Sequence, residues 1–197
     1  RGRPLKDAVL ASHTAVLQAV SNGQGGQGMG STVVALRAQG EMFKIAWVGD
    51  SRAYLWRPGV EPSLTQLSVD HSYVQMLYQS GAISEDELET HPEKNIITQC
   101  LGSTELEAVV VDEVEGQWYK QDRIILCSDG LSDAVPSRMI SDILSKSANT
   151  RTATKLLIEA ALSLGGKDNI TVTVVEYPGS FRNLWLKAKA SFKKLLD

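Results

Sequence analysis

Two strongly apolar runs, each beside an acidic turn, constrain the fold of this chain more than any other feature. The run at 123–127 ends just before Asp129, and Asp168 stands just ahead of the β-branched run at 170–175. Both runs predict buried strands. Strands of this kind lying side by side would bring the two carboxylates together at one sheet edge. Because close carboxylates repel unless a proton or a cation neutralises them, the pattern favours a hard divalent ion such as magnesium or manganese.

A third acidic turn, Gly49-Asp50-Ser51, lies between two further apolar runs at 42–49 and 52–57. A plain alternative exists for all three turns, because Asp-Gly, Asp-Asn and Asp-Ser are common turn formers. In that alternative, Asp50 caps the turn of a simple hairpin. The occurrence of three such turns in one chain favours a metal site built from Asp50, Asp129 and Asp168.

Composition limits the class of protein without identifying it. With 197 residues, 43% of them hydrophobic, the chain can bury one sizeable core. The net charge of −3 and the pI near 5.7 argue against a nucleic-acid-binding face. No apolar run approaches the roughly 20 residues that span a membrane. Two cysteines, Cys100 and Cys127, do not form a disulfide framework, and we expect a reducing, cytoplasmic location.

The order of predicted elements indicates the fold class. Helical spacing of apolar residues predicts a helix over 5–20, and residues 31–38, 42–49 and 52–57 are predicted to form a meander of three strands. Strands, then helices, then strands favour an α+β fold of antiparallel sheets with helices outside. The further predicted elements are helices at 72–80, 137–145 and 151–164, a short helix opened by a capping box at Ser84, and strands at 109–114, 123–127 and 170–176.

The end of the chain has a different pattern from the rest. Residues 179–197 carry apolar side chains at helical spacing against a basic face, which predicts an amphipathic helix beyond a domain at 1–178. Such a helix is compatible with a membrane surface or a partner protein. Packing on its own domain is the favoured interpretation, because one short helix is a weak signal for either.

Seven short motifs occur in order along the chain: Gly30–Leu36, Val48–Tyr54, Asp70-His71-Ser72, His91–Asn95, Leu101-Gly102, Ser128–Leu131 and Asp168–Thr171. In this order they resemble the bacterial metal-dependent protein serine/threonine phosphatases of the type 2C (PPM) family. The resemblance covers about residues 5–177. It implies a four-layer α-β-β-α sandwich, in which two antiparallel sheets are flanked by helices.

The resemblance also implies a site and a reaction. Asp129 and Asp168 would bind metal, and Asp50 would share a weaker site with Asp129, for two or three Mn²⁺ or Mg²⁺ ions in all. A metal-bridged water would hydrolyse phosphoserine or phosphothreonine in a phosphoprotein, the substrate of a serine/threonine kinase. The segment 69–101 would form a mobile flap beside the site. Within that segment His71, like His91, is predicted to be a structural hydrogen bonder.

One part of the family pattern is not found in these 197 residues. Family members begin with an Arg-rich, Asp-bearing strand and an Asp-Gly-Met-Gly-Gly-like turn, which supply a bridging aspartate, a phosphate-binding arginine and often an acid histidine. We therefore expect an N-terminally incomplete domain of impaired activity, and leave the catalytic arginine and histidine unassigned. His13 lies within the first predicted helix and is not given that role. The alternative is a catalytically silent module that binds a partner or phosphoprotein, although the retained aspartates favour an enzyme.

Overall fold

The computed structural model describes residues 3–104 and 108–177. Its helices are α1 (Leu5–Ser21), α2 (Tyr73–Gln79), α3 (Asp129–Ser132), α4 (Ser137–Lys146) and α5 (Thr150–Ser163), with a 3₁₀ turn, η1, at Glu85–Glu87. Its strands are β1 (Val33–Gln39), β2 (Met42–Val48), β3 (Arg52–Trp56), β4 (Leu64–Gln66), β5 (Asp112–Gln117), β6 (Arg123–Cys127) and β7 (Val172–Glu176).

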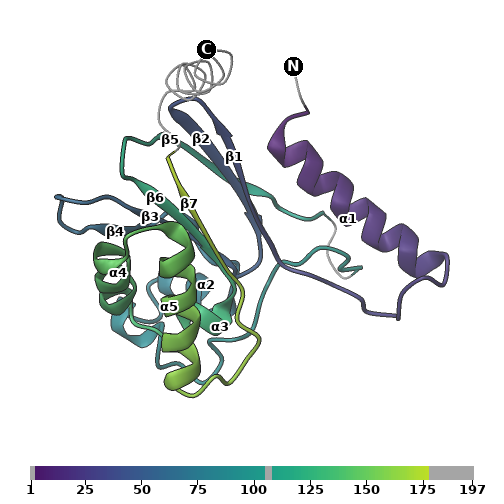
Figure 1. Cartoon of the computed structure of the whole chain (residues 1–197). Helices are drawn as coiled ribbons and strands as arrows, with labels where there is room; N and C mark the ends of the chain where they lie inside the picture. The colour runs from purple at the N-terminus through teal and green to yellow at the C-terminus, as the bar shows by residue number, and fades with distance from the viewer. Residues whose placement is uncertain (1–2, 105–107, 178–197) are drawn as a thin grey trace, which may run out of the picture.

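The strands form two antiparallel sheets with helices on their outer faces. One sheet has the order β1-β2-β5 and the other the order β4-β3-β6-β7. Helix α1 covers the first sheet, whereas α4 and α5 cover the second (Figure 1). The predicted α-β-β-α sandwich is therefore confirmed.

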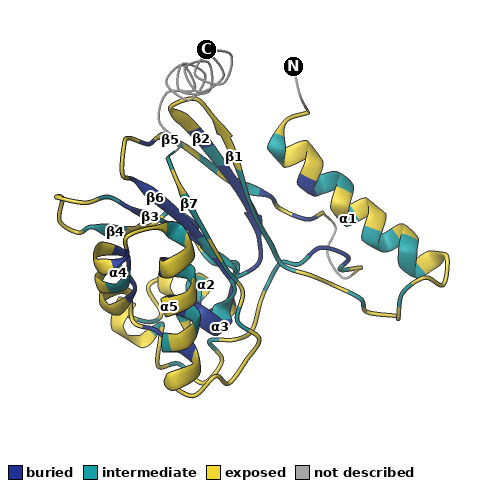
Figure 2. Ribbon diagram, viewed as in Figure 1, coloured by how far each residue is buried: buried dark blue, intermediate teal, exposed yellow. Residues whose placement is uncertain are grey.

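Three apolar layers hold the sandwich together, and burial is concentrated along its middle (Figure 2). The central layer joins the two sheets, for example through Trp47 of β2 and Ile124 of β6. The outer layers lie under α1, where Val9 is buried, and under the helices of the second sheet, where Leu157 of α5 is fully buried. Strand β6 is apolar from Ile124 to Cys127 because both of its faces are covered.

The predicted three-strand meander is wrong, because β2 and β3 belong to different sheets. Strand β2 pairs with β1 and β5, whereas β3 pairs with β4 and β6. The chain crosses between the sheets at Gly49, where φ is +104°, and a Cβ added there would lie 2.4 Å from Cγ2 of Thr32. Only glycine fits both the dihedral angle and the space. The hairpin alternative for the Asp50 turn is thereby excluded.

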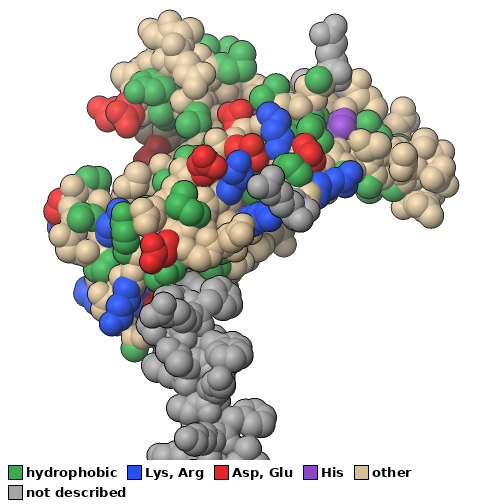
Figure 3. Space-filling model, turned by 90° about the horizontal axis from the view of Figure 1, so that it is seen from above, with side chains coloured by type: hydrophobic (Ala, Val, Ile, Leu, Met, Phe, Trp, Pro, Cys, Tyr) green, Lys and Arg blue, Asp and Glu red, His purple; other side chains and the backbone are tan. Residues whose placement is uncertain are grey.

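The predicted helices and the later strands are present with small shifts at their ends. Ser72 caps α2 by accepting a hydrogen bond from Gln75 N, and Asn149 caps α5 by accepting one from Thr152 N. No helix among the described residues is both long and apolar enough to cross a membrane. The helix predicted at 179–197 lies outside the described residues. Seen from above, basic and acidic side chains intermingle on the surface (Figure 3). One ion pair of the first sheet joins Lys44 to Glu115 at 3.4 Å.

Candidate metal and substrate site

The strand register brings two of the three acidic turns opposite each other. Strands β3 and β6 run antiparallel, with Arg52 paired to Cys127 at the end of the ladder. Two residues beyond that pair, the register places Asp50 opposite Asp129. The turn that contains Asp50 is also held by a hydrogen bond between the Ser51 and Thr32 hydroxyls, whose oxygens lie 3.0 Å apart.

The Asp129 and Asp168 turns are held together because Ser128 and Gly130 of the first turn contact the backbone of the second. The Ser128 hydroxyl accepts a hydrogen bond from Thr171 N at 3.0 Å and donates one to the carbonyl of Asn169 at 3.1 Å. Gly130 packs so tightly on the other turn that an added Cβ would lie 2.3 Å from the Asn169 carbonyl oxygen. The two acidic turns thus form one rigid unit at the end of the β6–β7 ladder.

Burial and mutual repulsion perturb two of the aspartates. The pKa of Asp129 is raised, first because burial removes water and next because the Asp168 charge is nearby. The pKa of Asp50 is raised for the same first reason, followed by the charge of Asp129. Asp129 therefore interacts with an acidic neighbour on each side. A cation at this position would relieve the repulsion.

Two cavities meet at Asp129. One, of about 580 Å³, is lined by Asp50, Asp129 and residues of the 69–101 segment. The other, of about 340 Å³, is lined by Asp129 and Asp168. Lys94 borders both cavities and forms an ion pair with Asp133 at 2.9 Å. Asp129 thus lies at the centre of a groove that begins near Asp50 and ends near Asp168.

Comparison with known proteins decides the family. Residues 3–75 match protein phosphatase 2C. A crystal structure of the serine/threonine phosphatase PstP/Ppp of Mycobacterium tuberculosis is similar with a TM-score of 0.79 and 35% identity, over 87% of this chain and 70% of that one. The chain belongs to the protein phosphatase 2C family.

Two further relatives of this phosphatase 2C chain are informative. A structure of the PstP catalytic domain in complex with two manganese ions has a TM-score of 0.75 and 32% identity, covering 89% of this chain and 73% of that one. The serine/threonine phosphatase stp of Listeria welshimeri is 40% identical over 162 residues, or 82% of this chain. The present chain spans 60% of the length of that Listeria relative.

The aspartates of this phosphatase 2C chain fit part of a metal shell. Carboxylate oxygens suit manganese and magnesium, and the pKa values of Asp50 and Asp129 are raised first by burial and then by the charge of a neighbouring aspartate, which a cation would offset. Within residues 3–104 and 108–177, no three His, Cys, Asp or Glu side chains converge closely enough to hold one ion. The fit is therefore by pairs, with Asp129 next to Asp50 on one side and Asp168 on the other.

The 69–101 segment forms one wall of the larger cavity, through residues that include Ser72, Gln75 and Glu85. This position agrees with the flap that the phosphatase 2C resemblance predicted. The cavity is also lined by Arg52 of β3 and by Asp70, for which the sequence predicted no role. An arginine within an otherwise apolar strand was the available signal, because burial of its charge demands a partner.

His71 and His91 make the structural hydrogen bonds that were predicted for them, and His13 makes one for which there was no prediction. His71 Nδ1 accepts from Gly49 N at 3.2 Å, and His91 Nδ1 accepts from Glu93 N at 3.1 Å. His13 Nδ1 accepts from Gly102 N at 3.0 Å. Burial raises the pKa of the Cys127 thiol to about 12, which keeps it protonated and unreactive.

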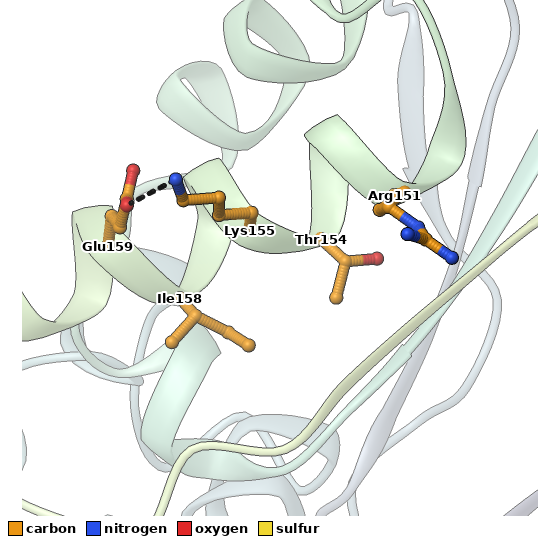
Figure 4. A pocket seen from close by; sticks show the side chains of 5 residues that line it. All are labelled: Arg151, Thr154, Lys155, Ile158 and Glu159. Carbon is orange, nitrogen blue, oxygen red and sulfur yellow. Dashed lines mark ion pairs between the residues drawn. The ribbon is translucent and has the colours of Figure 1, made fainter.

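A further cavity, of about 530 Å³, lies along α5 and away from the acidic turns. It is lined by Arg151, Thr154, Lys155, Ile158 and Glu159. Lys155 pairs with Glu159 along the helix at 3.5 Å, and the Thr154 and Ile158 side chains project from the helix below that pair (Figure 4). A single ion pair with apolar neighbours provides no catalytic grouping, so the acidic groove is the candidate site.

Proposed function

We propose that this protein hydrolyses phosphoserine and phosphothreonine in proteins with bound manganese or magnesium. The observation that carries the proposal is the alignment of Asp50, Asp129 and Asp168 along one groove, where burial and repulsion raise the pKa of the first two. The serine/threonine phosphatases among its relatives support the substrate class. Substrates phosphorylated by a serine/threonine kinase, and a cytoplasmic location, belong to the same proposal.

The three aspartates divide the binding of the ions between them. Asp129 and Asp168 would hold the principal ion or ions, and Asp50 with Asp129 a weaker one, which gives two or three in total. Bound there, the ions supply charge neutralisation at the phosphoryl group and an activated water. Asp129 and Asp168 each have one oxygen bonded to the following backbone N–H, which orients the carboxylate.

Basic side chains around the groove can attract the phosphate of a phosphoprotein. Lys94 borders both cavities, and although it pairs with Asp133 at 2.9 Å, that pair is partly exposed, so the ammonium can still attract a phosphate. Arg52 is less suited to this, because its guanidinium donates three hydrogen bonds to Asp70 in a more buried pair. We therefore assign Lys94 to attracting the substrate. Charge on the phosphoryl group that is transferred would be neutralised by the ions.

The test is hydrolysis of a phosphothreonine peptide as a function of added Mn²⁺. Asp168→Asn should lower kcat/KM by at least ~100-fold, since loss of a Lewis-acid site costs several kcal/mol of transition-state stabilisation. Asp142→Asn is the matched control, because Asp142 is exposed on α4 and lies outside both cavities. Metal-independent hydrolysis, or equal losses in the two variants, would contradict the proposal.

A second candidate is a catalytically silent module that binds a phosphoprotein. The observation that favours it is that no three described ligands converge on one point. Calorimetry separates the candidates. Binding of a phosphothreonine peptide without any turnover at saturating Mn²⁺ would support the silent module, whereas Mn²⁺-dependent release of phosphate would exclude it.

A further inference from the structure

We infer that Asp70 and His71 act together as a clamp that positions Asp50 and connects it to the 72–97 segment. Both are positioning residues, because neither is placed to bind the reacting phosphate. The inference rests on the proposed function, since it assigns Asp50 to an ion whose affinity the clamp controls. Four observations carry it, one for each end of the Asp50 turn, one for the far side of the His71 ring and one for the segment base.

His71 holds the start of the turn through both polar groups of Gly49. Its backbone N–H donates to the Gly49 carbonyl at 3.0 Å, and its Nδ1 accepts from the Gly49 N–H at 3.2 Å. Gly49 is the residue whose positive φ sends the chain from one sheet to the other. The direction in which Asp50 leaves that crossing therefore depends on His71.

The His71 ring is itself fixed on its far side. Because Nδ1 accepts a hydrogen bond, the ring proton lies on Nε2, which faces Asp112 Oδ2 on β5 at 3.4 Å. The ring also lies beside the Trp47 indole, with centroids 6.4 Å apart, and its side chain is only 11% exposed. His71 thus connects the turn to the first sheet.

Asp70 holds the other end of the turn through Arg52. Arg52 Nε donates to both Asp70 oxygens, at 3.1 and 2.9 Å, and Nη2 donates to Oδ2 at 2.7 Å. Gln66 Nε2 adds a hydrogen bond to Oδ1 at 3.3 Å. This fork explains why Asp70, although it lines the acidic cavity, does not serve as another ion ligand: its charge is matched by a guanidinium.

The clamp is also the base of the 72–97 segment. The His71 carbonyl accepts from Thr98 N at 2.8 Å, and the Ile96 carbonyl accepts from Tyr73 N at 2.8 Å. Ser72 and Ile97 form an isolated antiparallel bridge between these bonds. A displacement of the segment at its base therefore moves His71, and through Gly49 it moves Asp50.

A double-mutant cycle on the full chain tests the clamp. Outer partners that orient metal ligands typically change metal affinity by about 10–100-fold. His71→Phe should therefore raise the Mn²⁺ dissociation constant measured by titration calorimetry at least ~10-fold, and the Mn²⁺ concentration for half-maximal activity with it. His71→Asn, which can still present an acceptor to Gly49, should restore part of the loss. His91→Phe is the matched control, because it removes the hydrogen bond that His91 Nδ1 accepts from Glu93 N but keeps an aromatic ring beside Tyr73, so it should leave Mn²⁺ activation unchanged.

The cycle distinguishes positioning from general destabilisation. In an Asp50→Asn background, His71→Phe should cause no further loss of Mn²⁺ affinity, because the residue that it positions is already gone. Equal losses in both backgrounds, or an unchanged Mn²⁺ requirement in folded His71→Phe, would overturn the clamp. If His71→Phe does not fold, the same comparison is made with His71→Asn. A wild-type protein without Mn²⁺-dependent activity would instead refute the proposed function.

Discussion

Gly130→Ala should separate the stability of this protein from its activity. An added Cβ would lie 2.3 Å from the Asn169 carbonyl oxygen, whereas ordinary contacts begin near 3.4 Å, so the two turns must move apart by about 1 Å. Overpacking of this kind costs about 1–3 kcal/mol, and the better helix propensity of alanine returns up to about 1 kcal/mol. The net loss of about 0–3 kcal/mol corresponds to a fall in Tm of up to roughly 12 °C for a domain of this size.

Gly130→Ala should also lower the rate of hydrolysis by the protein that remains folded. A misplacement of about 1 Å in a catalytic arrangement can cost ~100-fold in rate, and Gly130 lies between the Asp129 and Asp168 turns. Mn²⁺-dependent hydrolysis of a phosphothreonine peptide and thermal melting would measure the two effects. Gly26→Ala is the control, because its Cβ would meet nothing within 4 Å. A Gly130→Ala protein with wild-type activity and Mn²⁺ affinity would refute the view that this contact sets the spacing of the carboxylates.

Three other outcomes are expected. Asp122→Ala should lower the free energy of unfolding by about 3 kcal/mol in a denaturant titration, because Asp122 is 1% exposed and holds the Arg57 guanidinium. Asp129→Asn should raise the Tm of metal-free protein at pH 7, since a raised pKa means that ionisation opposes folding; the gain should vanish as the pH falls to 3.8 and below. A peptide able to pair with the outer edge of β7 should raise Tm with its concentration, and an N-methylated version should not.

The sequence correctly predicted that Asp129 and Asp168 lie close together, for a physical reason. Both strands are short apolar or β-branched runs with an acidic residue at one end, and antiparallel pairing of such runs brings Asp129 and Asp168 together. Local pattern alone was sufficient there. The ladder hydrogen bonds and the Ser128 contacts then complete the arrangement.

The sequence did not predict how Asp50 reaches the same groove. The sequence pattern of the two strands beside Gly49 is the same whether they pair with each other or belong to different sheets. Which pairing forms depends on contacts with distant strands. The crossing depends on the positive φ of Gly49, which is seen in the folded chain and not in the sequence. The Arg52–Asp70 pair was missed for a similar reason, because the two residues lie 18 positions apart and meet only in the folded protein.

Because the aspartates are positioned in two different ways, the proposed ions should differ in affinity. Asp129 and Asp168 are fixed within one sheet by the β6–β7 ladder and by the contact of Gly130 with Asn169, neither of which involves the 72–97 segment. Asp50 comes from a turn between sheets, and its direction depends on Gly49, His71 and the base of the 72–97 segment. An ion beside Asp168 should therefore bind with an affinity that is insensitive to that segment. An ion beside Asp50 should bind more weakly and respond to whatever contacts the segment, which makes Asp50 the point where substrate binding can adjust the metal site.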